Sequence, residues 1–378
     1  MLRKGLILIL VAALLMGSCL AAPETKAPSC ILMDKATGTV LYEQEADQQL
    51  APASVTKVMT LLLVMEAIDR GQLSWDDMIT ASAAAAAKGG SQVYLEENEQ
   101  MSVREMVKCV TVASANDCAT ALAEAVAGSE SGFVEKMNQR AAELGMVNTH
   151  FANCTGLDDE AGPGEHYTSS RDIAIMSREL LSHDAIREFT TIWMDTIRDG
   201  NFGLSNTNKL VRFYQGTTGL KTGFTSSAGY CMSASAERDG MELIAVVMKC
   251  ESSTDRFESA KALLEYGFAN YTLLDPLEDT VIEPVPVVLG TSETVEAVPQ
   301  ETSPILLEKA AAAGISREVE LAESVNAPVE QGQTLGSITL KNGDTEVGKI
   351  PLVAGVAVPK LGWGQLMGYL VQRLWMGA

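Results

Sequence analysis

The chain has 378 residues, enough for two or three domains of ordinary size. It is 47% hydrophobic and 20% charged, a composition that is typical of a globular protein and not of a disordered chain. The formal net charge of -21 argues against a nucleic-acid partner, because an acidic surface repels phosphates.

The N-terminal segment has the residue order of an export signal. Arg3 and Lys4 precede an apolar run at residues 5–16 that is too short to span a bilayer comfortably, and small residues follow. We therefore predict a secretory signal peptide at residues 1–26 and an exported protein. A lipoprotein signal acylated at Cys19 is an alternative. An uncleaved core helix fits the charge-then-apolar order less well.

The remaining cysteines and the histidines show no metal-site spacing, so no metal or other cofactor is expected. An exported chain permits disulfides, but apolar surroundings favour buried free thiols, with one or two bridges as the alternative. The histidines lie beside no candidate nucleophile, and structural roles suffice for them. These residues are Cys30, Cys109, Cys118, Cys154, Cys231, Cys250, His150, His166 and His183.

Residues 27–271 predict one mixed α/β (α+β) domain. Hairpins are expected around residues 37–38 and 238–240, and helical patterns lie between them. Both hairpins need an antiparallel sheet, which the helices would cover. Ser169 or Ser170 is the expected cap of the helix before the second hairpin. The predicted helices cover residues 54–71, 102–114, 117–128, 131–145, 169–183 and 255–271.

Composition changes after Tyr271. Over residues 272–358 prolines recur, most helix signals vanish and valine becomes more frequent, which predicts a small β domain. A hairpin is expected around Asn342-Gly343. The stretch at residues 305–315, "ILLEKAAAAGI", predicts either a short helix or an alanine-rich connection between strands.

The last segment, residues 359–378, predicts an amphipathic helix. Its apolar residues fall on one stripe bracketed by tryptophans, a pattern that suits a helix lying on a membrane surface. The alternative is a terminal helix packed on its own domain. The stripe consists of Trp363, Leu366, Met367, Leu370, Leu374 and Trp375.

A serine precedes a lysine by three positions, Ser54 and Lys57, at the head of the first predicted helix. Such a quartet is expected about once by chance in a chain of this length, so alone it decides nothing. On a helix the two side chains share a face, and a serine in the first turn keeps a free backbone N–H. Apolar neighbours would desolvate the amine and favour its neutral form, which can accept the serine proton. The alternative is an ordinary surface lysine.

Two further segments complete a set. The triplet Ser-Ala-Asn at residues 114–116 lies between two predicted helices, where a hydroxyl and an amide can face one cleft, although Asn116 would serve equally as a helix cap. The triplet Lys-Thr-Gly at residues 221–223 lies in a strand-like run, and its glycine admits another backbone closely. A β-bulge with a solvated lysine is the alternative there.

The order Ser-x-x-Lys, Ser-x-Asn, Lys-Thr-Gly is a known signature of penicillin-binding proteins and class A β-lactamases. With it, the chain resembles the serine-type D-alanyl-D-alanine carboxypeptidases, the low-molecular-mass penicillin-binding proteins, from signal to tail. The resemblance implies a β-lactamase/transpeptidase-like catalytic domain with a small C-terminal β domain. Supporting stretches are "GGSQVYLEENEQMSVREM", "MNQRAAELGMVNTHFANCTGL", "HYTSSRDIAIM" and "NTNKLVRFYQGTTGLKTGFT".

The resemblance implies catalytic roles in removing the terminal D-alanine from a peptidoglycan stem pentapeptide. Ser54 would attack the penultimate D-alanine carbonyl, and Lys57 would accept the serine proton. The backbone N–H groups of Ser54 and Phe224 would form the oxyanion hole. Ser114 would relay a proton to the leaving amine.

The resemblance also implies substrate-binding roles. Asn116 would hold the substrate peptide and help orient Lys57. Lys221 and Thr222 would bind the terminal carboxylate, with Lys221 also lowering the proton affinity of Lys57 by repulsion. The substrate would lie antiparallel to the strand that contains Gly223.

Arg256, in "TDRFESAK", is a further candidate for binding the carboxylate. The alternative is a surface ion pair with Asp255 or Glu258. Penicillins would acylate Ser54 as substrate mimics, and the C-terminal helix would rest on the outer face of the cytoplasmic membrane.

Some residues depart from the family pattern. Ala115 stands where many relatives have glycine, and Cys118 where a small residue is common. No Glu-x-x-x-Asn loop is recognisable, which argues against efficient penicillin hydrolysis. A β-lactamase-type hydrolase and an inactive cell-wall-binding protein are the alternative functions.

Overall fold

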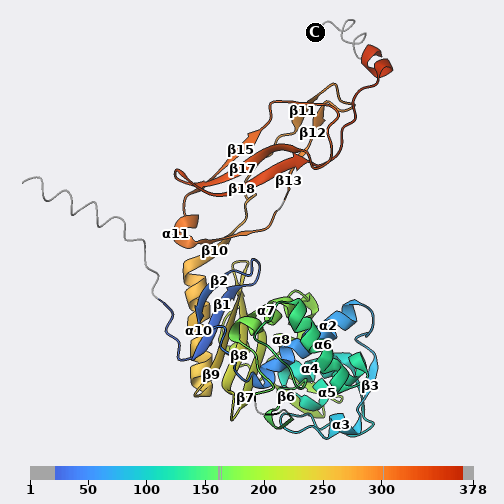
Figure 1. The fold of residues 1–378 in the computed structure, drawn as a ribbon, viewed down its shortest axis with the longest axis vertical. Helices are drawn as coiled ribbons and strands as arrows, with labels where there is room; N and C mark the ends of the chain where they lie inside the picture. The colour runs from blue at the N-terminus through green and yellow to red at the C-terminus, as the bar shows by residue number, and fades with distance from the viewer. Residues whose placement is uncertain (1–21, 161, 163, 301, 369–378) are drawn as a thin grey trace, which may run out of the picture. The chain divides into compact units, whose positions relative to one another are not determined.

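The computed structural model in Figure 1 describes residues 22–160, 162, 164–300 and 302–368. Most of the predicted signal peptide, Cys19 and residues 369–378 of the predicted tail helix lie outside these residues. The chain divides into two compact units, Met1–Ala269 and Asn270–Ala378.

A five-stranded antiparallel sheet forms the centre of the first unit. Its strands are β1 (Ser29–Asp34), β2 (Val40–Gln44), β7 (Thr217–Thr225), β8 (Gly229–Arg238) and β9 (Met241–Cys250). They lie in the order β2-β1-β9-β8-β7, so β1 and β9 from the two ends of the unit pair with each other. Both predicted hairpins of this unit are confirmed by the pairs β1–β2 and β8–β9. Strand β7 lies at the edge of the sheet, paired with β8.

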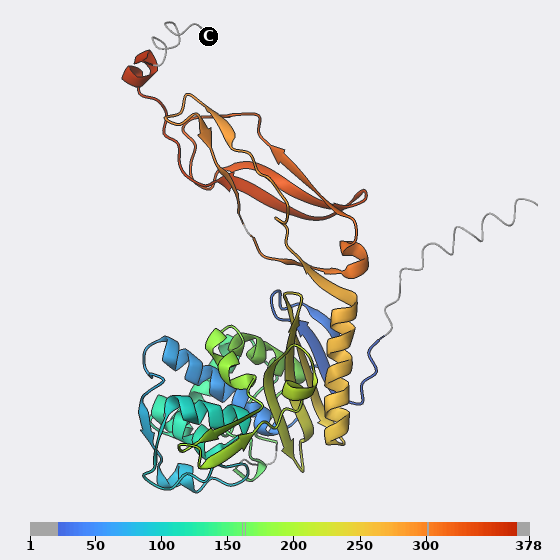
Figure 2. The same cartoon turned by 180° about the vertical axis from the view of Figure 1, so that it is seen from behind.

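Helices cover both faces of this sheet, as the opposite views of Figures 1 and 2 show. Helix α10 (Ser253–Asn270) lies on one face, and a larger group packs on the other. The predicted order of a hairpin, several helices, a second hairpin and a last helix therefore forms an antiparallel sheet covered by helices, as expected. The larger group comprises α2 (Lys57–Asp69), α4 (Val103–Val112), α5 (Asn116–Ala127), α6 (Glu130–Glu143) and α7 (Ser170–Leu180).

Short elements form much of the connections in this unit. They are η2 (Ala53–Thr56), β3 (Met78–Thr80), α3 (Ala83–Ala86), β4 (Gln100–Ser102), η3 (Asp158–Glu160), η4 (Asp184–Ile186), α8 (Arg187–Thr190), β5 (Met194–Ile197), β6 (Phe202–Ser205) and α9 (Leu210–Phe213). Strands β3 and β4 pair with each other, as do β5 and β6.

Two helix starts differ in detail from the prediction or decide between its alternatives. The helix predicted from residue 54 begins as the tight turn η2, because the Val55 N–H bonds to the Pro52 carbonyl three residues back. At α7, Ser169 is the cap, since its hydroxyl accepts from the Asp172 N–H at 3.1 Å.

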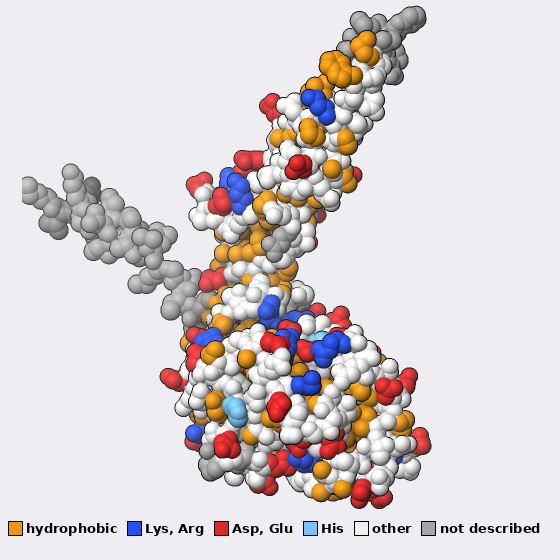
Figure 3. Space-filling model, turned by 45° about the vertical axis from the view of Figure 1, so that its right-hand side comes forward, with side chains coloured by type: hydrophobic (Ala, Val, Ile, Leu, Met, Phe, Trp, Pro, Cys, Tyr) orange, Lys and Arg blue, Asp and Glu red, His pale blue; other side chains and the backbone are white. Residues whose placement is uncertain are grey.

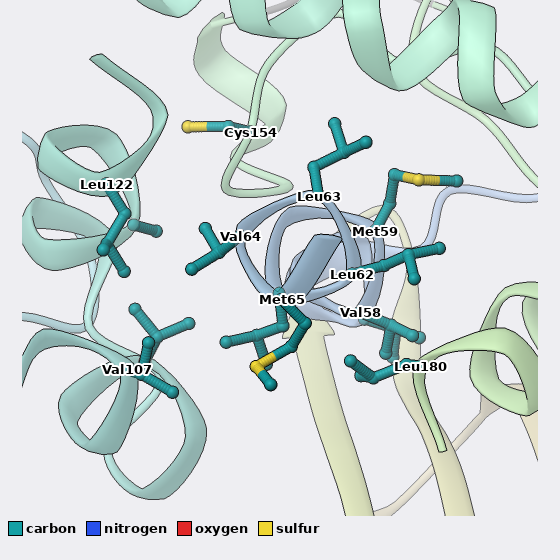
Figure 4. Close-up of a cluster of buried hydrophobic side chains, with 14 of the residues drawn as sticks. Val58, Met59, Leu62, Leu63, Val64, Met65, Val107, Leu122, Cys154 and Leu180 are labelled. Atoms are coloured by element: carbon teal, nitrogen blue, oxygen red, sulfur yellow. The ribbon is translucent and has the colours of Figure 1, made fainter. Parts of the chain in front are cut away.

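Helix α2 runs through the core of the first unit. Residues 57–65 are all buried, so this stretch has no solvent-facing stripe, which is the pattern of a helix enclosed on all sides. Figure 4 looks along α2 and shows its apolar side chains pointing outward in every direction, toward Val107, Leu122 and Leu180 among others. Lys57 stands at the N-terminal end of this apolar helix.

The cysteines within the described residues are all buried and free. The prediction of buried thiols is confirmed, and no bridge joins any of Cys30, Cys109, Cys118, Cys154, Cys231 and Cys250.

The second unit is built mainly from strands around its own apolar core. A four-stranded sheet has the order β13 (Ala297–Pro299), β18 (Thr345–Ala354), β17 (Thr334–Asn342) and β15 (Ile315–Leu321). Its β17–β18 pair confirms the hairpin expected at Asn342-Gly343. The stretch at residues 305–315 forms a strand and then one helical turn, so each predicted alternative describes a part of it. The elements are β10 (Tyr271–Leu274), β11 (Val285–Val288), β12 (Thr294–Val295), β13 (Ala297–Pro299), β14 (Ile305–Glu308), α11 (Lys309–Ala312), β15 (Ile315–Leu321), β16 (Val325–Asn326), β17 (Thr334–Asn342) and β18 (Thr345–Ala354).

The described part of the C-terminal tail is helical over residues 363–368. Trp363 is 85% exposed and Met367 is 59% exposed. Figure 3 shows hydrophobic side chains at the end of this unit where the described chain stops. Among the described residues, no helix is both long and apolar enough to cross a bilayer.

Gly156 allows a loop to pack against the turn that contains Ser54. Its φ is +84°, and an added Cβ would lie 1.9 Å from the Ala53 carbonyl oxygen. We expect Gly156→Ala to lower the free energy of unfolding by about 2 kcal/mol or more. The alanine would strain the backbone at its positive φ, and its Cβ would also force the Ala53 backbone to move.

Gly145→Ala is the matched control, since Gly145 has a similar φ of +74° but nothing within 4 Å of its added Cβ. Urea unfolding of both variants measures the difference. Equal losses of stability would contradict the close approach of the two backbones.

Candidate active site

Ser54 lies in η2, directly before α2. The preceding Ala53 has a φ of 49°, in the left-handed region that alanine rarely adopts. Such strain persists only where surrounding structure enforces it, and it is common at active sites. The Gly156 loop and Gly223 of β7 both pack against this turn and provide that enforcement.

Lys57 faces the Ser54 hydroxyl. Its Nζ lies 2.9 Å from Ser54 Oγ and donates to the Thr155 carbonyl oxygen at 2.8 Å. The Ser-x-x-Lys spacing predicted the first contact. It did not predict Thr155, because a backbone carbonyl from a distant loop leaves no residue signature in the sequence.

The Lys57 amine is fully buried. Burial lowers the pKa of Lys57 from 10.5 to about 7, although the nearby charges of Asp117 and Glu160 act in the opposite direction. A substantial neutral fraction is thus present near pH 7, and only the neutral amine can accept a proton.

A second serine–lysine pair lies at the same site. Lys221 Nζ, on β7, lies 2.8 Å from Ser114 Oγ and donates to the Thr222 carbonyl at 2.8 Å. Ser114 stands between α4 and α5 with a φ of 62°, again in the left-handed region. The strand thereby reaches the turn between two helices, which brings two of the three segments together.

Burial also lowers the pKa of Lys221 well below its usual value, and repulsion from Lys57 and Arg256 lowers it further. This is the repulsion between the two lysines that was expected, and it disfavours having both amines charged at once. For Lys57 itself, burial is the main cause of the lowered pKa.

Gly223 brings β7 against the Ser54 turn. An added Cβ would lie 2.7 Å from the Pro52 carbonyl oxygen and 3.1 Å from the Ser54 nitrogen. Only glycine permits this approach. The next residue, Phe224, is therefore beside the Ser54 backbone, with its side chain 55% exposed.

Thr222 has a partner that sequence patterns did not reveal. Its hydroxyl donates to Thr207 Oγ1 at 2.7 Å, and the Thr207 N–H donates to the Val112 carbonyl at the end of α4. Thr207 lies in the stretch "NTNKLVRFYQGTTGLKTGFT", which carried part of the family resemblance, but its residue type alone suggests no role.

Asn116 departs from its expected contact. Its Nδ2 donates to the Gly89 carbonyl at 2.7 Å, and its buried Oδ1 has no hydrogen-bond partner within the described residues. The expected orientation of Lys57 by Asn116 is replaced by a contact with Thr155. The free Oδ1 remains available as an acceptor.

Arg256 is buried and does not form the surface ion pair given as its alternative. Its guanidinium donates to the carbonyls of Gly223 at 3.0 Å and Cys231 at 3.4 Å. Asp255 pairs instead with Lys26 at 2.7 Å. The side chain thus contacts the backbone of β7 and β8.

His166 contacts the turn that contains Ser54 through Thr56. Its Nδ1 accepts from the Ala152 N–H at 3.1 Å, and its Nε2 lies 2.8 Å from Thr56 Oγ1. Burial lowers the pKa of His166 to about 4, so the ring is neutral near pH 7.

Among the described residues, no histidine, cysteine or acidic cluster is arranged to hold a metal ion.

Comparison with known proteins decides the family. Residues 17–252 match the family model described as D-alanyl-D-alanine carboxypeptidase. The chain belongs to the D-alanyl-D-alanine carboxypeptidase family. Residues 276–360 match the model of the penicillin-binding protein 5 C-terminal domain.

Relatives agree with this assignment along most of the chain. D-alanyl-D-alanine carboxypeptidase DacF of Bacillus subtilis is 39% identical over 89% of this chain and 87% of its own. The crystal structure of penicillin-binding protein 5 from Haemophilus influenzae has a TM-score of 0.73 and 30% identity, over 90% of this chain and 99% of its own. Penicillin-binding protein D2 from Listeria monocytogenes, in its ampicillin-bound form, has a TM-score of 0.59 and 34% identity over 65% of this chain and 98% of its own.

The predicted carboxypeptidase family, the enzyme class and the β-lactamase/transpeptidase-like fold with a C-terminal β domain are confirmed at the level of family and fold. Nothing in these comparisons favours the β-lactamase or the inactive binding protein.

The lowered pKa of Lys57 predicts a pH dependence of acylation. Lys57 is expected to accept the serine proton in its neutral form, so the rate constant for acylation by a β-lactam should rise about tenfold per pH unit below about pH 7 and level off above it. Stopped-flow measurement with a chromogenic cephalosporin tests this, with thermal melting at each pH to exclude unfolding. A rate that is flat or falls through this range would contradict it.

Proposed function

We propose that the protein is a serine-type D-alanyl-D-alanine carboxypeptidase that removes the terminal D-alanine of peptidoglycan stem pentapeptides through an acyl-enzyme on Ser54. The observation that carries the proposal is Ser54 Oγ at 2.9 Å from the buried amine of Lys57. Family membership supports the choice of substrate. We propose residues 27–271 as the catalytic domain.

In the first step, Ser54 Oγ bonds to the carbonyl carbon of the penultimate D-alanine while neutral Lys57 takes the serine proton. Negative charge moves to the carbonyl oxygen, where the N–H groups of Ser54 and Phe224 stabilise it. The close approach of Gly223 to the Ser54 nitrogen supports this pairing of donors.

The tetrahedral intermediate then collapses and the C–N bond breaks. The leaving D-alanine amine needs a proton, for which Ser114 is the proposed relay. Its contact with Lys221 supports that role, because the amine can resupply the hydroxyl. Water then attacks the acyl carbonyl and the bond from the carbonyl carbon to Ser54 Oγ breaks. Ser54 Oγ takes back the proton held by Lys57, and the proton released by the water returns through Ser114 to Lys221.

The terminal carboxylate of the substrate is proposed to bind at Lys221 and Thr222, with Thr207 holding the Thr222 hydroxyl. An arriving carboxylate favours the charged form of Lys221 and opposes the effect of burial. The free edge of β7 supports strand addition by the peptide, and the unpaired Asn116 Oδ1 can accept from its backbone.

β-Lactams are proposed to acylate Ser54 as mimics of the substrate. The ampicillin-bound and cefotaxime-bound structures of the Listeria relative support this.

Export and membrane association also form part of the proposal. The N-terminal charge-then-apolar order supports export. The exposed Trp363 and Met367 support a tail that rests on the outer face of the cytoplasmic membrane.

Ser54→Ala should lower release of free D-alanine from diacetyl-Lys-D-Ala-D-Ala by about 10⁴-fold or more, because Ser54 is the only hydroxyl hydrogen-bonded to Lys57 Nζ within the described residues. It should also abolish covalent labelling by fluorescent penicillin. Ser182→Ala, at an exposed helix end, is the control and should keep both activities. Retained release in Ser54→Ala would overturn the proposed nucleophile.

The tail should bind lipid by hydrophobic contact. Residues 27–378 should sediment with phosphatidylglycerol–phosphatidylethanolamine vesicles, also in about 0.5 M salt, where charge attraction is screened. A chain that ends at residue 358, and the double variant Trp363→Ser/Met367→Ser, should stay in the supernatant. Val281→Ser, which removes another exposed apolar side chain, should sediment normally. Failure of the full chain to sediment would refute membrane association.

A further inference from the structure

Arg256 places a buried positive charge directly behind the oxyanion-hole strand. The residue lies on α10 and is only 7% exposed. Its Nη1 donates to the Gly223 carbonyl at 3.0 Å and to the Cys231 carbonyl at 3.4 Å, and its Nη2 donates to Ser253 Oγ at 3.3 Å. The guanidinium therefore contacts both strands of the β7–β8 pair.

No carboxylate compensates this charge among the ion pairs of the described residues. The guanidinium carbon lies 5.4 Å from the Tyr230 ring centroid and 4.7 Å from that of Phe257. The buried Nε has no partner within the described residues. Because a buried charge is costly, it depends on the carbonyl oxygens and aromatic rings that it contacts.

The contact with the Gly223 carbonyl determines where the next N–H points. The carbonyl of one residue and the N–H of the next belong to a single planar peptide unit, and in a strand they point in opposite directions. Gly223 and Phe224 oppose Cys231 and Tyr230 of β8. Arg256 binds the Gly223 and Cys231 carbonyls together, so the Gly223 carbonyl is turned toward β8.

The Phe224 N–H consequently points away from β8, toward the free edge of β7. Gly223 approaches the Ser54 backbone at this edge, with an added Cβ 3.1 Å from the Ser54 nitrogen. The two proposed oxyanion donors are thus on the same side of β7, and Arg256 binds the opposite, carbonyl edge of the same peptide unit.

We propose that Arg256 is a positioning residue for the oxyanion hole and not a ligand of the substrate carboxylate. It holds the Gly223–Phe224 peptide plane in one orientation. Its charge also polarises that peptide, which makes the Phe224 N–H a stronger donor when the carbonyl oxygen of the substrate becomes negative. The inference rests on the proposed function, because it assigns Arg256 to the same reaction.

A boronic acid distinguishes the two roles. An N-acyl D-1-aminoethylboronic acid carries no carboxylate, and its boron accepts Ser54 Oγ to form a tetrahedral adduct that places a negative oxygen in the oxyanion hole. Arg256→Met should weaken this inhibitor and slow acylation by penicillin by similar factors, roughly 10- to 100-fold. Arg256→Lys, which keeps a charge but donates with different geometry, should recover part of the loss in both. Unchanged boronate affinity in Arg256→Met would overturn the proposal.

Two controls complete the experiment. Thr222→Val should slow the reaction with substrates that bear a carboxylate and leave boronate affinity nearly unchanged. This is the result expected when a residue that binds the substrate carboxylate is substituted. Arg238→Met removes another arginine that packs on aromatic rings, at the end of β8. It should change neither the boronate affinity nor the rate of acylation by penicillin. Thermal melting of each variant distinguishes a loss of folding from a weakened Phe224 N–H donor in a folded protein.

If Arg256→Met does not fold, Arg256→Lys and Arg256→Gln carry the same comparison. Release of D-alanine by the unaltered protein separates the two hypotheses. Absence of release would refute the proposed function, whereas normal release with a boronate affinity insensitive to Arg256 would refute only this inference.

Discussion

The burial of one amine, that of Lys57, is the constraint on which the rest of the site depends. Its position at the start of a helix enclosed on all sides removes water from the ammonium form and lowers its pKa to about 7. An apolar helix would ordinarily exclude such a group, and here the Ser54 hydroxyl and the Thr155 carbonyl give it hydrogen bonds. The apolar core therefore supplies stability and also keeps a substantial fraction of the Lys57 amine neutral near pH 7, the form that can accept a proton.

Close backbone packing holds the turn that contains Ser54 beside that amine. Gly156 and Gly223 both press against the turn that contains Ser54, where a side chain at either position would collide with backbone atoms. Ala53 and Ser114 adopt left-handed backbone conformations beside the site. The helices packed on the sheet and the edge strand β7 together maintain these strained conformations. Such packing keeps hydrogen-bond donors aligned in a preorganised site before a substrate binds.

Much of the molecule could be predicted from local patterns. Hairpins at Gly38, Asp239 and Gly343 follow from turn chemistry, and the helices follow from apolar periodicity. The three motifs carry side chains with distinctive chemistry, so their residues could be named from the sequence. Thr155 and Thr207 could not, because one contributes a carbonyl and the other an ordinary hydroxyl. The free edge of β7 depends on strand order, which local patterns do not encode.

The sequence by itself determined the element types, the three motifs and, through their order, the family. Only the tertiary structure decided that Asn116 bonds to Gly89 instead of Lys57, that Arg256 lies under β7 instead of on the surface, and that burial is the main cause of the lowered Lys57 pKa. The reason is physical. Local propensity acts over a few residues, whereas desolvation and hydrogen-bond partners depend on what segments distant in the chain bring against each side chain.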